Sequence, residues 1–333
     1  MRGFVIANYN GPLHEAEIAE PVVGDRDVLV QVRAAGLNQL DELIRSGQFK
    51  QVLRYTFPLV LGNDVAGTVL DVGANVRSFK PGDNVYARPD KARMGAFAER
   101  VAVAEDDLAP MPASLTFAEA GSLPLVALTA WQALVERGEL RAGQKVLIHA
   151  GAGGVGSIAI QLAKHLGASV ATTASGANAD VVRELGADVV IDYRTADFEQ
   201  ILSGYHLVLD SLGGENLEKS LRVLRPGGKA IGISGPPDVA FARELGLNPL
   251  LRLVIAAASW KVRKLAKKLG VEYQFLFMRA NGDQLRQITE LVEQGALGPV
   301  VGRTFSFDQT AQALASLAEG GVRGKTVIVH SAD

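Results

Sequence analysis

The sequence contains no cysteine, which excludes disulfides, thiolate metal ligands and a thiol nucleophile. Its five histidines are scattered, without the close spacing that metal ligands show. No apolar run reaches membrane-spanning length, and the first residues carry no signal or transit pattern. The formal net charge is only −2, so no excess of positive charge favours nucleic acid or an anionic membrane surface. These absences predict a soluble, cytoplasmic globular protein with no nucleic-acid partner.

Glycine, in contrast, is abundant, and four of the 36 glycines fall within six residues, in a segment that follows an apolar strand and precedes a helical pattern. The strand ends near Ile148, the helical pattern covers 158–165, and a second strand begins near Ala168. Between them lie Gly151, Ala152, Gly153, Gly154, Val155 and Gly156. This order lets a pyrophosphate approach the first turn of a helix, where free N–H groups favour negative charge. An ordinary glycine turn does not explain four glycines within six residues, so we predict a dinucleotide site.

The patterns on either side of residue 120 differ. Residues 4–120 contain short strands between turn signals, which are typical of a compact all-β or partly open barrel module. From 145 to 233, strands alternate with helices, which predicts a parallel sheet covered on both faces. Residues 239–270 and 282–293 have helical patterns, and 273–278 and 326–330 read as further strands. The sequence therefore predicts an α/β fold with one strand-rich part and one doubly wound part.

Several motifs occur in an order that resembles the medium-chain dehydrogenase/reductase superfamily. They are Ala-Gly-Leu-Asn-Gln-Leu-Asp at 35–41, Leu-Gly-Asn-Asp-Val-Ala-Gly-Thr at 61–68, Pro-Gly-Asp at 81–83, Ala-Leu-Thr-Ala-Trp at 127–131, and the glycine cluster. The resemblance covers the whole chain. It implies a GroES-like catalytic domain formed by residues 1–121 and 281–333, and a Rossmann NADP-binding domain formed by residues 122–280.

The chain departs from the zinc-dependent members of that superfamily at their metal ligands. Asn38 stands where they have a catalytic cysteine, Asn63 replaces the histidine, and the third ligand position falls near Leu125. Amides bind zinc poorly, so we predict no metal. The chain then resembles the zinc-independent quinone oxidoreductase and enone reductase branch. Within that branch, segments 268–278 and 322–326 are most similar to mitochondrial NADPH oxidoreductases and plastid enone reductases.

The end of the second strand of the dinucleotide fold favours NADPH over NADH. NAD-specific folds place Asp or Glu there, whereas segment 170–175 has no acid and ends in Ser175, whose hydroxyl can donate to a 2′-phosphate. The resemblance implies a second phosphate contact from Tyr193. The neighbouring Arg194 either binds the phosphate or is a solvated turn residue.

The resemblance also assigns further cofactor contacts. It implies that Thr129 lies near the nicotinamide and Ser211 near a ribose. The backbone of Phe277 and Met278 would meet the carboxamide, and Arg323 or Lys325 would reach the phosphates. Ordinary packing is the open alternative for most of these residues.

Without a metal or an activated nucleophile, the protein can still position a hydride donor against an electron-poor acceptor. We therefore predict an NADPH-dependent oxidoreductase that reduces a quinone or an α,β-unsaturated carbonyl. Asn38 would hold an acceptor or ribose oxygen, or serve as a structural amide in a turn. Tyr55 and Tyr273 are candidate proton donors, or buried tyrosines with ordinary partners. The alternatives are a reductase of other carbonyl or nitro compounds and a non-catalytic NADPH-binding sensor or scaffold.

Two expectations concern partners. Residues 247–268 are apolar first and basic afterwards, which suits either a lid that rests on a membrane surface or a core-packed helix pair with a solvated basic face. We favour the core-packed pair. By the family resemblance, the 273–278 strand lies at a sheet edge and pairs across a two-fold axis, which predicts a homodimer.

Overall fold

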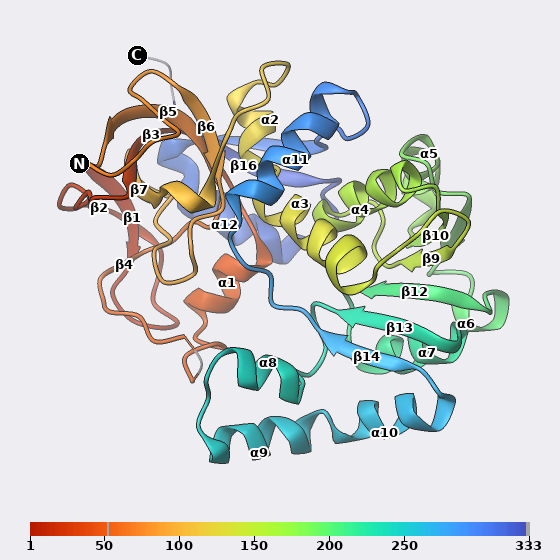
Figure 1. Cartoon of the computed structure of the whole chain (residues 1–333). Coiled ribbons are helices and arrows are strands. Elements are labelled where there is room, and N and C mark those ends of the chain that lie inside the picture. The colour runs from red at the N-terminus through yellow and green to blue at the C-terminus, as the bar shows by residue number, and fades with distance from the viewer. Residues whose placement is uncertain (52, 331–333) are drawn as a thin grey trace. The chain divides into compact units, whose positions relative to one another are not determined.

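The computed structural model describes residues 1–51 and 53–330. The chain forms two compact units (Figure 1), one of Met1–Leu128 with Arg279–Asp333 and one of Thr129–Met278. We call them unit 1 and unit 2. The division between them falls within helix α3 (Pro124–Trp131), which continues into a π-helical stretch at Gln132–Arg137.

Unit 1 is built on strands, as expected. A seven-stranded sheet has the order β15-β16-β3-β5-β6-β8 with β7 also paired to β3, and a small sheet has the order β2-β1-β4. The pairings are antiparallel except for β15 with β16. The strands are β1 (Arg2–Ile6), β2 (His14–Glu17), β3 (Asp27–Gly36), β4 (Leu59–Val60), β5 (Val65–Val72), β6 (Asn84–Ala87), β7 (Arg100–Ala104), β8 (Leu108–Pro110), β15 (Val301–Ser306) and β16 (Lys325–Val329).

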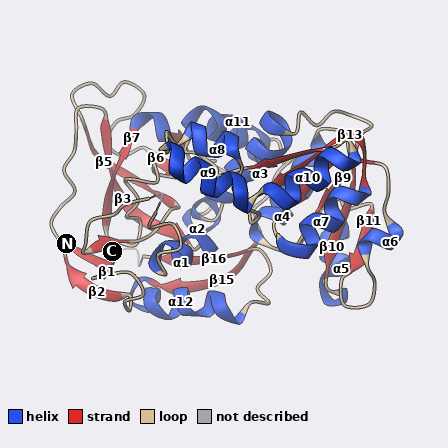
Figure 2. Ribbon diagram, turned by 90° about the horizontal axis from the view of Figure 1, so that it is seen from below, coloured by secondary structure: helices blue, strands red, loops and turns tan. Residues whose placement is uncertain are grey.

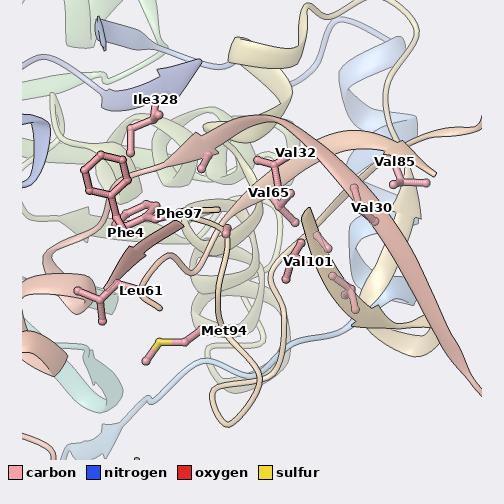
Figure 3. Close-up of a cluster of buried hydrophobic side chains, with 14 of the residues drawn as sticks. Phe4, Val30, Val32, Leu61, Val65, Val85, Met94, Phe97, Val101 and Ile328 are labelled. Carbon is pink, nitrogen blue, oxygen red and sulfur yellow. The ribbon is translucent and has the colours of Figure 1, made fainter. Parts of the chain in front are cut away.

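The core of unit 1 follows from the alternating pattern of its longest strand. Val28, Val30 and Val32 of β3 are buried, whereas Leu29 and Gln31 between them are partly exposed, as expected for a strand with one face on a core. Ile328 of β16 belongs to the same buried cluster (Figure 3). A strand near the end of the chain therefore packs into the same core as the early strand β3.

In the described part of unit 1, four α-helices accompany the strands in addition to the start of α3. They are α1 (Gln39–Arg45), α2 (Phe117–Gly121), α11 (Gly282–Glu293) and α12 (Thr310–Ser316). The predicted helix at 282–293 is confirmed with the same bounds. Helix α1 lies within the stretch that was expected to hold only strands.

Unit 2 contains a six-stranded sheet of order β11-β10-β9-β12-β13-β14 in which every pairing is parallel. Figure 2 shows helices around its strands. The strands are β9 (Lys145–Ile148), β10 (Ser169–Ala174), β11 (Val189–Asp192), β12 (Tyr205–Asp210), β13 (Leu224–Gly232) and β14 (Glu272–Phe275). The helices are α4 (Gly154–His165), α5 (Ala179–Glu184), α6 (Phe198–Ile201), α7 (Gly214–Val223), α8 (Val239–Glu244), α9 (Pro249–Ala258) and α10 (Trp260–Leu269). The predicted doubly wound parallel sheet is confirmed.

Two expectations about the last third of unit 2 need correction. The strand predicted over 273–278 ends at Phe275, although it does form the edge of the sheet. The core-packed interpretation of 247–268 is wrong for α9, which has no buried residue, whereas α10 buries Val262 and Ala266.

Candidate functional site

The turn between β9 and α4 is held by backbone hydrogen bonds. Ala150 has a φ of 52°, an uncommon left-handed conformation for a residue other than glycine. The Gly151 N–H donates to Thr173 O at 3.0 Å, and the Gly153 N–H donates to Ala150 O at 2.9 Å. Gly153 then caps α4 with an extended backbone and no side chain. The chain therefore turns directly from a buried strand into a helix.

Two glycines of this turn, Gly151 and Gly156, are required by close contacts. A Cβ added at Gly151 would lie 2.2 Å from Thr172 Oγ1, and one at Gly156 would lie 2.3 Å from Ala150 O. Gly153, Gly154 and Val155 are partly exposed, and the first N–H groups of a helix have no intrahelical partner. These residues, together with Ala152, fit a pyrophosphate: its oxygens can accept from the N–H groups without meeting a side chain at Gly153.

A buried polar network lies beneath this turn, and the sequence analysis did not identify it. The ring of His149 contacts Thr173 Oγ1 at 3.1 Å through Nδ1 and Ser220 Oγ at 2.8 Å through Nε2. The Ser220 hydroxyl also lies 3.2 Å from Asp210 Oδ2. Burial lowers the pKa of His149, so the ring is neutral and can both donate and accept. The network links β10, β12 and α7 to the residue that follows β9.

The same network positions Ser211. Its Oγ donates to His149 O at 3.4 Å, while Asp210 Oδ1 accepts from the Leu212 and Gly213 N–H groups at 3.2 and 2.7 Å. Ser211 therefore lies at the carboxyl end of β12, next to the residue that leads into the glycine turn. Ligands bind at these strand ends in open parallel sheets.

The predicted phosphate contacts also gather at strand ends. Ala174 of β10 pairs with Asp192 of β11, so Ser175 and Tyr193 follow directly from paired residues. Tyr193 is 60% exposed, and the Arg194 guanidinium lies 5.9 Å from the centre of its ring. The structure thus brings Ser175, Tyr193 and Arg194 to one edge of the sheet.

An acidic residue that the sequence analysis overlooked lies at the same edge. A Cβ added at Gly176 would be 2.7 Å from Asp192 Oδ2, so this carboxylate faces the residue after Ser175. Asp192 Oδ1 accepts from the Arg194 N–H at 3.0 Å. A carboxylate here opposes a 2′-phosphate, and Arg194 is the nearest cation in sequence to offset it.

The other predicted cofactor residues of unit 2 are well packed. Thr129 is buried in α3, and Met278 is buried beyond the end of β14. The Phe277 ring packs on that of Phe241 with 5.9 Å between centroids. This packing gives the Phe277 and Met278 side chains a structural role within unit 2.

Of the two basic residues proposed for the phosphates, Arg323 lies in the loop before β16 and is exposed, whereas Lys325 is buried. Lys325 Nζ donates to Leu37 O at 2.6 Å and to Asn38 Oδ1, and lies 3.2 Å from Asp64 Oδ2. All three N–H groups of the ammonium therefore have acceptors inside unit 1. These bonds favour a structural role for Lys325 over contact with a cofactor phosphate, because leaving its partners would strand a buried cation.

Asn38 belongs to the same buried cluster. Its Nδ2 donates to Asp64 Oδ2 at 2.9 Å, and its backbone N–H donates to Asp41 Oδ2 at 2.8 Å. Asp41 Oδ1 accepts from Asn63 Nδ2 at 2.7 Å, while Asn63 Oδ1 has no partner among the described residues. Burial raises the pKa of Asp41 to about 6. The Asn38 side chain is therefore committed to structural bonds, which favours the structural alternative for this residue.

The cluster is poorly suited to zinc. The Asn38 oxygen already faces the Lys325 ammonium, which would repel a metal ion. Residues 1–51 and 53–330 contain no group of three or more His, Cys, Asp or Glu side chains able to hold a metal. The donor set therefore does not fit a catalytic zinc.

The two candidate tyrosines differ in their surroundings. Tyr273 OH donates to Pro236 O at 2.8 Å and lines a hollow of about 300 Å³, and burial raises its pKa. Tyr55 OH donates to Lys91 O at 3.0 Å, and burial raises its pKa to about 12. Both hydroxyls therefore remain protonated at neutral pH.

Arg88 is a functional candidate that the sequence analysis missed. Its side chain is buried, and one Nη donates to Pro89 O at 2.7 Å. Its Nε and other Nη have no partner within the described residues, and burial lowers its pKa. The Arg88 charge lies close enough to Tyr55 to lower the pKa of that hydroxyl, against the larger effect of burial. No motif surrounds Arg88, so only the fold could reveal it.

Comparisons with known proteins agree with this architecture. The alcohol dehydrogenase GroES-like domain family matches residues 24–113, and the zinc-binding dehydrogenase family matches residues 185–328. The mitochondrial NAD(P)H oxidoreductase RTN4IP1 of Danio rerio is 38% identical over 91% of this chain and 83% of its own length. The chloroplastic NADPH-dependent alkenal/one oxidoreductase of Arabidopsis thaliana is 36% identical over 98% and 79%.

A solved structure extends the agreement to three dimensions. The quinone oxidoreductase of Coxiella burnetii superposes with a TM-score of 0.84 at 30% identity, and the match covers 99% of both chains. The chain therefore belongs to the medium-chain dehydrogenase/reductase superfamily and is an NAD(P)H oxidoreductase, homologous to its quinone and alkenal/one oxidoreductases.

Proposed function

We propose that this enzyme transfers a hydride from NADPH to a quinone or to an alkene conjugated with a carbonyl. The observation that carries the proposal is the glycine turn, which leaves the first N–H groups of α4 without a capping side chain. NADPH, when bound, supplies the hydride. The relatives described above support this choice through their names, which include NADPH and alkenal/one or quinone substrates.

On the cofactor side, Gly151–Gly156 would hold the pyrophosphate, and Ser175, Tyr193 and Arg194 would hold the 2′-phosphate. Ser211 and Thr129 would contact the ribose and the nicotinamide end. The Ser175 hydroxyl accepts from Asn178 Nδ2 at 3.2 Å, which leaves its proton free to donate to a phosphate oxygen. Exposed Arg194 can then offset the charge of Asp192.

On the acceptor side, we assign Tyr55 and Arg88. Hydride addition leaves negative charge on an enolate or hydroquinone oxygen, and the N–H groups of Arg88 that lack a partner in the described chain can stabilise that charge. Tyr55 would donate a hydrogen bond to the same oxygen and a proton that water restores. Tyr273 is a weaker candidate, because the charges near its hydroxyl are those of Asp238 and Asp210, whereas Tyr55 lies near the cation of Arg88.

The test is a panel of quinones, 2-alkenals, alkenones, simple ketones and nitro compounds, with oxidation of NADPH followed by absorbance. We expect turnover with the first three classes and little with the others. Tyr55→Phe should lower kcat without weakening NADPH binding. Tight NADPH binding without turnover on any compound would instead support a sensor or scaffold, and turnover confined to ketones or nitro compounds would support another reductase.

We also propose that the protein is a cytoplasmic homodimer. Strand β14 is the edge of the unit 2 sheet, and an edge strand can pair with a second copy, although the Phe275 N–H already donates to Asp238 Oδ2 at 3.0 Å. Two of the relatives are named as mitochondrial or chloroplastic, so fractionation of the native cell is the direct check of location.

A further inference from the structure

Helix α9 exposes an apolar face. Leu250, Leu253 and Val254 are 71%, 67% and 57% exposed, and Ala257 is exposed one turn later. Their spacing of three, four and seven residues from Leu250 places them on one side of the helix. Soluble helices normally turn such a stripe toward a core, but α9 has no buried residue. Within unit 2, α9 contacts α8 and α10, and Figure 1 shows these helices at the outer side of β14.

Helix α10 follows after the single residue Ser259 and is strongly basic. Lys261, Arg263, Lys264, Lys267 and Lys268 are all exposed. No Asp or Glu occurs between residues 247 and 271. Lys261 pairs with Glu218 of α7 at 2.6 Å, whereas Lys264, Lys267 and Lys268 have no carboxylate partner in the described part of the chain. The exposed apolar face of α9 is therefore followed, on α10, by exposed lysines that have no carboxylate partner.

Trp260 stands at the junction of the two surfaces. Its side chain is 58% exposed, and Lys264 Nζ lies 4.6 Å from the centre of its ring. Tryptophan favours the boundary between headgroups and acyl chains, because one end of the indole is apolar and its N–H can be hydrated. Apolar residues, a boundary tryptophan and lysines together are the features of a helix that lies in a membrane interface.

Charge decides between the possible occupants of this surface. If a second copy of the chain docked through its own α9 and α10, it would present the same lysines. That surface lacks the negative charge that would complement them. A zwitterionic bilayer would engage only the apolar face. An anionic bilayer satisfies both parts, because its acyl boundary accepts leucine and its phosphates attract lysine.

We propose that α9 and α10 form a docking surface for an anionic lipid bilayer. The α9 stripe enters the headgroup boundary, and the lysines of α10 contact lipid phosphates. No helix within residues 1–51 and 53–330 is long and apolar enough to cross a membrane, so this contact is peripheral. The proposal does not depend on the identity of the electron acceptor.

The experiment is flotation of the full chain with two sets of vesicles, one of phosphatidylcholine alone and one that also contains phosphatidylglycerol. We expect association with the anionic vesicles, little with the neutral ones, and release as salt is raised. Lys264→Gln with Lys267→Gln and Lys268→Gln should weaken binding by about 100-fold, since each lysine near an anionic surface contributes about fivefold. Leu253→Ser with Val254→Ser should weaken it by at least about tenfold, because each buried methylene contributes about fourfold.

Matched controls are Val22→Ser, which changes an exposed valine of unit 1, and Lys50→Gln with Lys80→Gln, which change exposed lysines outside α10. These variants should float like the parent. Failure of the parent to bind anionic vesicles at low salt would overturn the proposal, as would equal binding to neutral vesicles. Dissociation of an oligomer by the Leu253 and Val254 changes, without vesicle binding by the parent, would assign α9 to self-association instead. If a variant misfolds, the salt dependence of the parent still provides the test.

Discussion

At the scale of single residues, Asp41 provides a test of how burial controls protonation. Its carboxyl is fully buried, and its pKa rises from 3.8 to about 6. The folded chain therefore binds this proton more tightly than the unfolded chain. The stabilisation is complete below pH 3.8 and is lost as the pH rises through about 6. The shift corresponds to about 3 kcal/mol of unfolding free energy.

We predict that Asp41→Asn removes much of this pH dependence. The Asn63 Oδ1 atom, which lacks a partner in the described chain, can accept from the introduced amide if the Asn63 side chain flips. The oxygen of the introduced amide can still accept from the Asn38 N–H. Denaturant unfolding at pH 4 and pH 7 measures the effect. Asp71→Asn, which changes an exposed aspartate of β5, is the control. An unaltered pH slope in Asp41→Asn would mean that Asp41 is ionised throughout.

Lys325 gives a second prediction at this scale. Lys325→Met leaves the buried Asp64 carboxylate without its cation, and breaking such a pair costs about 3–5 kcal/mol. The exposed Lys80→Met should change the unfolding free energy by less than about 0.5 kcal/mol. Chemical denaturation of both variants is the measurement. Equal stability of the two variants would show that water, not Lys325, satisfies Asp64.

Lys325 also shows which features of the site could not be predicted from the sequence. Lys325 and Arg323 differ by two positions in a basic turn, and nothing in the spacing says that Lys325 begins β16 and faces inward. Arg88 was missed because no motif surrounds it, and His149 was missed because its partners, Thr173 and Ser220, lie far away in sequence. Ser175, Tyr193 and Arg194 were identified together because they follow strands whose ends the alternating pattern already defined.

At the scale of elements, the periodicity of apolar residues predicted the bounds of helices and strands correctly where the apolar pattern was strong. The bounds of β9 and of α11 match the prediction. Strand β15 was missed because it lies at a sheet edge and is largely exposed. Without a buried face, its sequence lacks the apolar alternation that predicts a strand. Helix α1 is short and begins at the Asn38 cap, within a stretch that otherwise reads as strand.

The glycine turn gives a prediction for an element. Gly153 has a φ of −82°, and its added Cβ would meet only Ala150 O at 3.2 Å, so Gly153→Ala should fold. The new methyl would stand at the capping position of α4, where it would crowd a pyrophosphate, and we expect NADPH affinity to fall by at least about tenfold. Gly156→Ala places its Cβ 2.3 Å from Ala150 O and should lower stability as well. Fluorescence titration with NADPH and thermal melts separate the two effects, and unchanged affinity in Gly153→Ala would place the pyrophosphate elsewhere.

At the scale of the whole molecule, the edge of the unit 2 sheet leads to the last prediction. Strand β14 is paired with β13 at the end of the sheet order, and a free edge attracts another strand unless it is blocked. Pairing of two β14 edges across a two-fold axis would bring the two copies of this short strand, and the side chains on each face of it, close together. Light scattering should therefore give twice the chain mass of 35.2 kDa.

Gln274 lies within β14, is partly exposed, and its Oε1 has no partner in the described residues. Gln274→Lys should shift the protein toward monomer, because like charges opposite each other on neighbouring strands repel. Lys268→Gln, which changes charge on α10 but not on the strand, is the control. A parent protein of single-chain mass at micromolar concentration would contradict the edge pairing. Loss of the dimer in Lys268→Gln, with Gln274→Lys unaffected, would place the interface on α10.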